Sequence, residues 1–171
     1  MKTTKKLFLL IVILMTSIGT YAQKFAYVDS DYILSKMTEF VQAEEKIDDF
    51  SKEWQSEIEL AYEEVEQMYR DYQSEQVLLT SEMKTKREEA IIEKEKSVQS
   101  LQQKYFGNNG DLYKKRQDLI KPIQDRISDA VQQLAASNKY SIIFDASSDL
   151  IMLYSNPDLD KSDKILELMG Y

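Results

Sequence analysis

Apolar residues recur every three or four positions between residues 39 and 79, in a segment that contains no Gly or Pro. This spacing is typical of an amphipathic helix with one apolar stripe. The stripe reads as heptads with one extra four-residue step, which locally unwinds a left-handed supercoil. We therefore predict one long helix that packs against a partner helix. The stripe consists of Ile47, Phe50, Trp54, Ile58, Ala61, Val65, Met68 and Tyr72.

Residues 82–121 repeat the pattern over a similar length, with Thr80 and Ser81 between the two segments. Two equal helices joined by so short a connection predict an antiparallel coiled-coil hairpin over residues 39–121, with its tip near residues 80–81. The first segment is strongly acidic and the second slightly basic, which favours their pairing. A rival tip at residues 108–109 would leave arms of very unequal length.

Residues 107–110 (GNNG) interrupt the second helix. They lack a preceding strand and the glycine and lysine spacing of a phosphate-binding loop. We expect a break at which Asp111 recaps the helix and Gly107 leaves room for Trp54 on the facing helix. Pro122 is expected to end this second arm, with a new helical turn from Ile123.

Short strands are predicted at both ends of the chain, over residues 24–28, 140–145 and 150–154, with residues 146–149 as a hairpin-like loop. Three strands so short do not form a stable sheet alone, so several subunits are expected to pool them. This predicts an oligomerisation body of residues 23–38 and 122–171. Its candidate residues are Phe25, Tyr27, Val28, Ile142, Ile143, Phe144, Ile151 and Leu153.

The first 22 residues carry three lysines, then an apolar run over residues 7–15, then small residues. This order is typical of a secretory signal peptide cleaved before Gln23. A retained anchor is the alternative, but the run is shorter than the roughly 20 residues that span a bilayer.

Composition narrows the function. The 171 residues include 43% hydrophobic and 30% charged residues but only 4 Gly and 2 Pro, as expected for long helices. Without His or Cys, the chain lacks the commonest general base, thiol nucleophile and zinc ligands, so we predict no enzyme, no metal and no cofactor. The carboxylates Asp29, Asp31 and Asp145 are the only rival catalytic set, and the first two are better read as a helix cap. A net charge of −8 argues against nucleic acid as a partner, because phosphate binding needs a basic surface.

The mature chain resembles the Skp/OmpH family of periplasmic chaperones, and the order of its segments around a hairpin carries the resemblance. The segments are residues 24–29 (KFAYVD), 118–123 (DLIKPI), 140–145 (YSIIFD), 150–154 (LIMLY) and 158–166 (DLDKSDKIL). The resemblance implies a mainly α chain with a small β body, in which a coiled-coil hairpin protrudes like a tentacle from a trimeric, β-barrel-like assembly. It further implies a homotrimer in the periplasm that holds unfolded outer-membrane proteins between its arms and uses no ATP.

The apolar tip fits this function, since it would offer adaptable contacts to unfolded chains. The candidate client-binding residues are Tyr62, Tyr69, Tyr72, Val77, Leu78, Leu79 and Met83. The tyrosines could instead belong to the coiled-coil seam, and the tip could pack on itself. The well-studied relatives are basic, whereas the acidic charge here argues against contact with membrane surfaces. An exported coiled-coil scaffold that binds a folded envelope partner is the alternative function.

Overall fold

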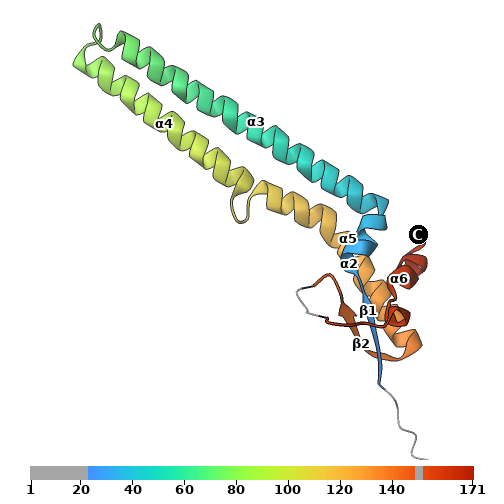
Figure 1. Ribbon diagram of the computed structural model, residues 1–171. Coiled ribbons are helices and arrows are strands. Elements are labelled where there is room, and N and C mark those ends of the chain that lie inside the picture. The colour runs from blue at the N-terminus through green and yellow to red at the C-terminus, as the bar shows by residue number, and fades with distance from the viewer. Residues whose placement is uncertain (1–22, 149–151) are drawn as a thin grey trace, which may run out of the picture.

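The computed structural model describes residues 23–148 and 152–171, which form a slender helical arm and a smaller body (Figure 1). These residues are mostly helical with one small sheet, in line with the predicted class. Its elements are β1 (Lys24–Val28), α2 (Ser30–Lys36), α3 (Thr38–Glu75), α4 (Ser81–Phe106), α5 (Asp111–Asn138), β2 (Tyr140–Asp145), the short 3-10 helix η1 (Pro157–Leu159) and α6 (Ser162–Met169).

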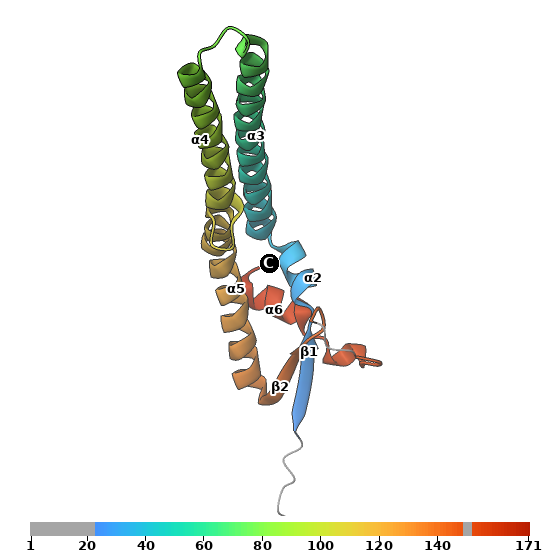
Figure 2. The same ribbon diagram turned by 90° about the vertical axis from the view of Figure 1, so that its left-hand side faces the viewer.

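The arm consists of α3 on one side and α4 with the first part of α5 on the other (Figures 1 and 2). At its far end α3 stops at Glu75, four residues before the predicted end. Residues 76–79 form a turn in which the Leu78 backbone N–H donates to the Glu75 carbonyl at 2.8 Å. Helix α4 begins directly afterwards, because the Thr80 hydroxyl accepts from the Met83 backbone N–H at 3.3 Å and caps it.

A break separates α4 from α5 while α3 continues past it without interruption. A Cβ atom on Gly107 would lie 2.4 Å from the Gln103 carbonyl oxygen, and one on Gly110 would lie 2.7 Å from the Tyr105 carbonyl oxygen. Both positions therefore need glycine because backbone segments approach closely there. The predicted break is confirmed, but its two expected details are wrong.

The first of these predictions was that Gly107 leaves room for Trp54. The Trp54 ring instead stacks on Tyr105, with 4.7 Å between ring centroids. The second was that Asp111 caps the new helix. Gly110 occupies the capping position without a side-chain bond, and Asp111 is the first helical residue, paired with Lys114 at 3.1 Å.

Pro122 does not interrupt the helix, contrary to the new helical turn expected from Ile123, because α5 runs through it to Asn138. Proline removes one backbone hydrogen bond and strains the preceding turn. Here the neighbouring residues Ile120, Ile123 and Ile127 are all buried in the body, so continued packing on both sides of the proline outweighs the local loss.

The sheet has two strands, and β1 pairs with β2 in parallel, with Phe25 opposite Ile142 and Tyr27 opposite Phe144. Within the described residues β2 thus pairs with β1, and the predicted hairpin between residues 140–145 and 150–154 is not formed. Residues 149–151 lie outside the described part, and residues 152–154 form no strand. A segment near Asp160 approaches β1 instead, where the Lys161 backbone N–H donates to the Tyr27 carbonyl at 2.9 Å.

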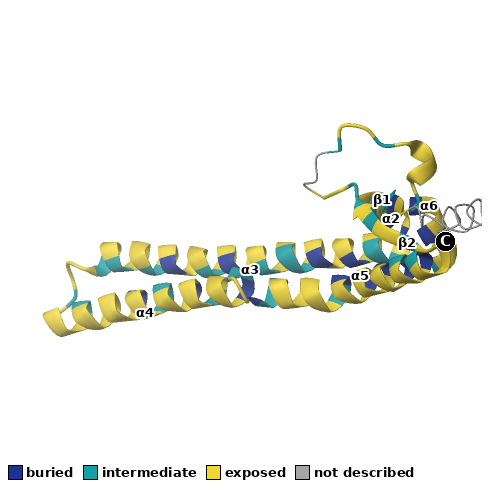
Figure 3. Ribbon diagram, turned by 90° about the horizontal axis from the view of Figure 1, so that it is seen from below, coloured by how far each residue is buried: buried dark blue, intermediate teal, exposed yellow. Residues whose placement is uncertain are grey.

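Buried residues are concentrated in the body and form a single row along the arm (Figure 3). The body core gathers side chains from α2, α5, α6, β1 and the base of α3, and Ile33, Met37 and Ile165 are fully buried there. In the arm, a second cluster contains Ile58, Val65, Val98 and Tyr105 between the helices. The arm therefore exposes most of its surface.

Candidate functional site: the arm and its tip

The tip of the arm exposes apolar side chains that no part of the described chain covers. Val77 is 87% exposed and Leu78 86% exposed, while Met83 at the start of α4 is also exposed. Leu79 is the one half-buried member of the predicted cluster. The side chains at the tip thus lie open to a partner.

The three predicted tyrosines lie along one side of the arm and bond across it. The Tyr69 hydroxyl donates to Glu95 at 3.1 Å, and Tyr72 donates to Glu88. Tyr62 lies 3.5 Å from the Gln102 side-chain oxygen. From Tyr62 to Tyr72 the residue numbers rise along α3, while those of the bonded residues on α4 fall from Gln102 to Glu88. This is the pattern of two helices that run in opposite directions.

These bonds affect the chemistry of the hydroxyls. The hydrogen bond to Glu95 raises the pKa of Tyr69, and the hydrogen bond to Glu88 raises the pKa of Tyr72, because the neutral phenol is the donor. Both side chains therefore stay uncharged at neutral pH. Tyr62 and Tyr69 are exposed and Tyr72 is half-buried, so their rings flank the seam between the helices rather than fill it.

The opposite side of the arm carries ion pairs. Lys94 pairs with Glu64, and Arg87 pairs with Glu75 at 3.3 Å. A shallow groove there is lined by Leu60, Ala61, Val98 and Leu101, among others. The two sides of the hairpin therefore differ in chemistry although they are built on the same two helices.

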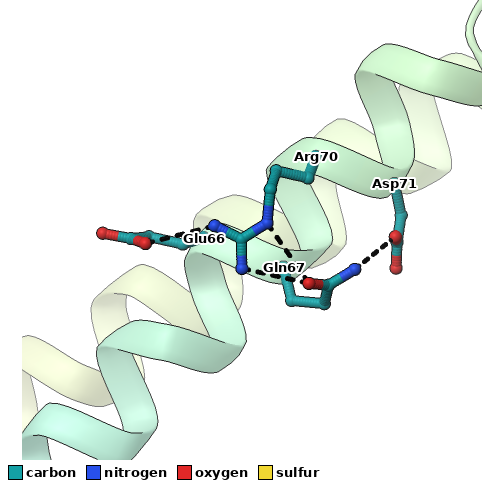
Figure 4. Close-up of polar contacts among 4 residues, drawn as sticks. All are labelled: Glu66, Gln67, Arg70 and Asp71. Carbon is teal, nitrogen blue, oxygen red and sulfur yellow. Dashed lines mark hydrogen bonds and ion pairs between the residues drawn. The ribbon is translucent and has the colours of Figure 1, made fainter.

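The outer surface of α3 is polar. Arg70 donates to Glu66 at 3.3 Å and, through two nitrogens, to Gln67, and Gln67 donates to Asp71 at 2.7 Å (Figure 4). All four side chains are exposed, and neighbouring groups on the same helix satisfy the guanidinium. These four residues present polar groups to solvent. The exposed apolar side chains near them therefore lie at the tip and on the two sides of the arm.

One face of the small sheet is also apolar and exposed. The in-register pairs Phe25 with Ile142 and Tyr27 with Phe144 point to the same face, and three of these four side chains are exposed. Val28 and Ile143 turn the other way, into the core of the chain itself. Of the remaining predicted body residues, Leu153 is exposed and Ile151 lies outside the described residues.

Two of the three carboxylates considered for catalysis, Asp145 and Asp29, have structural partners, whereas Asp31 is an exposed residue in the first turn of α2. Asp145 accepts four hydrogen bonds, from the backbone N–H and hydroxyl of Ser30 and of Ser147, at 2.7 to 3.1 Å. Burial would raise the pKa of Asp145, but these bonds lower it below its ordinary value. Asp29 accepts from the Tyr32 backbone N–H and caps α2. These groups hold the end of β2 to the start of α2.

Two further properties bear on the site. Over residues 23–148 and 152–171, His, Cys, Asp and Glu nowhere gather in a group of three able to hold a metal ion. Within the same ranges, no helix combines the length and apolarity that crossing a bilayer requires.

Comparison with known proteins identifies the class. The profile of the family described as "Outer membrane protein (OmpH-like)" matches residues 24–169. The chain belongs to this OmpH-like family, which confirms the resemblance seen in the sequence.

A solved structure supports the fold. The crystal structure of a candidate outer membrane chaperone (OmpH-like) from Caulobacter crescentus CB15 superposes with a TM-score of 0.69 at 12% identity. The match covers 87% of this chain and 85% of that one. Among curated proteins, none matches the sequence.

Three features of the site were missed in the sequence. The first is that Glu88 and Glu95 accept the tyrosine hydroxyls. The second is that Ile92 is exposed beside them. The third is that the predicted body residues divide between two faces of the sheet, because Val28 and Ile143 turn into the core. A helical wheel would have revealed the second, because Ile92 directly follows the buried seam residue Ile91.

Proposed function

We propose that this protein is an ATP-independent holdase chaperone of the periplasm, which binds unfolded outer-membrane proteins and keeps them from aggregating. The observation that carries the proposal is the apolar tip, where Val77 and Leu78 are almost fully exposed at the end of a thin arm. Membership in the OmpH-like family and the likeness to a candidate outer membrane chaperone support it.

The tip suits a holdase because its apolar area is small and divided among a few side chains. Single exposed side chains bind unfolded segments weakly, whereas a large patch would make the chaperone itself aggregate. Several such contacts acting together retain a client, while each contact exchanges quickly. Release then needs no nucleotide.

The exposed sheet face supports assembly into a homotrimer. A two-stranded sheet is marginal in water, and the pairs Phe25 with Ile142 and Tyr27 with Phe144 would be covered if three chains pooled their strands. In this arrangement residues 23–38 and 122–171 form the shared body and residues 39–121 the arm. Three arms around one axis would enclose a cavity for the client, and residues 1–22 would direct export and be removed.

The first test is light scattering of an unfolded outer-membrane β-barrel protein diluted from urea, with and without the purified chain and without nucleotide. Suppression that saturates near one oligomer per client supports the holdase. Unchanged aggregation at excess chaperone would contradict it and favour the alternative, an exported scaffold that binds a folded envelope partner.

The second test addresses the tip. The double substitution Val77→Ser and Leu78→Ser removes apolar contacts worth about 1 kcal/mol in client binding, so the concentration for half-maximal suppression should rise about fivefold. Assembly should be unchanged by light-scattering mass. The control is Leu60→Ser, an equally simple change at an exposed apolar residue on the side of the arm. Equal suppression by the tip variant and the parent would rule out the tip as a client site.

A further inference from the structure

The two sides of the hairpin are distinguished by residues adjacent to the seam. Ala61 lies in the seam, and one residue turns a helix by roughly 100°, so Leu60 and Tyr62 project to opposite sides of it. Leu60 lines the groove with Lys94, while Tyr62 reaches toward Gln102. We call the first side the ion-pair flank. We call the second side the tyrosine flank, and it consists of Tyr62, Tyr69, Tyr72, Glu88, Ile92 and Glu95.

The tyrosine flank combines aromatic rings with carboxylates. Because the hydroxyls of Tyr69 and Tyr72 are donated to Glu95 and Glu88, each ring is held beside a carboxylate. The face of an aromatic ring carries a negative quadrupole that attracts cations. An ionised carboxylate has about four lone-pair sites, so one accepted hydrogen bond leaves room for others. Each pair is therefore suited to a Lys or Arg side chain.

The charges on this flank are not neutralised within the described chain. Among residues 23–148 and 152–171, neither Glu88 nor Glu95 takes part in an ion pair, since their partners are neutral phenols. On the ion-pair flank, Lys94 and Arg87 already neutralise Glu64 and Glu75. A cationic partner would thus gain more from the tyrosine flank than from the opposite side.

Apolar surface lies next to these pairs. Ile92 is 47% exposed between Glu88 and Glu95 on α4, and Tyr62 is exposed farther along the same flank. A bound segment could therefore place a basic side chain against a ring and carboxylate, and an apolar side chain against Ile92. Such a flank would discriminate between clients, whereas the tip offers apolar contacts alone.

We propose that the tyrosine flank binds client segments in which a Lys or Arg side chain stands next to an apolar one. This inference rests on the proposed holdase function and adds the class of sequence that the arm prefers. Charge complementarity supports it, because the chain has a net charge of −8 and its longest helix is strongly acidic.

Binding of two labelled disordered peptides to the full chain tests the preference. One peptide alternates Phe, Lys and Ser, and its twin carries Glu in place of each Lys. Fluorescence anisotropy at low salt should show the Lys peptide binding about tenfold more tightly, and added salt should reduce the difference. Equal affinities, or tighter binding of the Glu peptide, would overturn the inference.

Substitution of the carboxylates assigns the effect to the flank. The double change Glu88→Gln and Glu95→Gln keeps acceptors for the tyrosine hydroxyls but removes both charges, and should abolish most of the preference for the Lys peptide. The matched control is Glu89→Gln with Glu93→Gln, two exposed residues of the same helix whose loss changes the net charge equally. If both double variants lose the preference to the same degree, overall charge is responsible and the assignment to the flank is wrong.

A photo-crosslinking side chain placed at Ile92 or at Leu60 separates the two flanks directly, since both residues are exposed and apolar. An unfolded outer-membrane client should crosslink severalfold more at position 92. Suppressed aggregation with equal crosslinking would reject the flank and leave the holdase intact. Unsuppressed aggregation with no crosslinking at either position would reject both.

Discussion

The body and the arm use apolar residues in opposite ways. In the body, five elements contribute side chains to one core, and Ile33, Met37 and Ile165 have no exposed surface. In the arm, two helices share one row of buried residues, and its tip exposes Val77 and Leu78. The same kind of side chain therefore stabilises the fold at one end and is available for binding at the other.

This difference has an energetic meaning. Each residue of the body core is held by neighbours from several elements, so removing one leaves a cavity that cannot collapse easily. Each residue of the arm's seam touches only the facing helix, so damage there stays local. Stability and exposure are thus separated along about 60 Å of helix.

The largest effect is expected in the body. Ile33→Ala should lower the free energy of unfolding by about 2–5 kcal/mol, because it creates a cavity in a fully enclosed core. The counterpart at the tip, Leu78→Ala, should change it by less than about 0.5 kcal/mol. Urea unfolding followed by circular dichroism, at one fixed protein concentration, measures both. Similar losses in the two variants would show that the tip is packed in solution.

A smaller effect is expected in the seam of the arm. Tyr105 is buried, stacks on Trp54 and donates its hydroxyl to Glu57 at 2.8 Å. Tyr105→Ala should cost about 3 kcal/mol and shift the emission of Trp54, the only tryptophan, to longer wavelength. Tyr105→Phe keeps the stack and should cost only about 1 kcal/mol. An unshifted emission in the alanine variant would refute the stacked arrangement.

The break between α4 and α5 should be sensitive to the size of the side chain at position 107. In Gly107→Ala the new Cβ would meet the Gln103 carbonyl oxygen, so the backbone must shift at a cost of about 2 kcal/mol. Asn108→Ala, at an exposed neighbouring position, is the control and should be nearly neutral. Thermal unfolding compares the two. Equal melting temperatures would mean that the break relaxes freely.

The smallest effect concerns pH at the body. Hydrogen bonds from Ser30 and Ser147 lower the pKa of Asp145 in the folded chain. A lowered folded-state pKa means stabilisation that is present above the unfolded carboxyl value of about 4 and is lost as pH falls through the folded value. Asp145→Asn should therefore cost about 1 kcal/mol at pH 7, and this cost should shrink toward pH 3. A cost that does not vary with pH would contradict the role of the charge.

The helical stripe was predictable because it depends on local periodicity, which the seam from Ile47 to Tyr72 displays over many turns. The early end of α3 was not, because residues 76–79 contain no helix-breaking residue. The predicted helix end at Pro122 was wrong, because the local free-energy cost of a proline in a helix is outweighed by burial of α5 against elements distant in sequence.

Pairing partners and side-chain bonds were harder to predict than elements. Strand propensity marked residues 140–145 correctly but could not say that they pair with β1 rather than with their neighbours in sequence. The bonds of Tyr69 and Tyr72 depend on how far each helix is rotated about its axis, which periodicity leaves open. The candidate tip residues could be predicted from the sequence, because they form an apolar run between two highly charged segments.

The parallel pairing of β1 with β2 has a consequence for the order of folding. Phe25 and Ile142 become neighbours only when the whole intervening chain has brought its ends together, and closing so long a loop is entropically unfavourable. Zipping of α3 against α4 and α5 would shorten the loop step by step. We therefore expect pulse-labelled amides of the arm to become protected before those of the two strands, so that the part of the molecule that reaches outward also brings the ends of the sheet together.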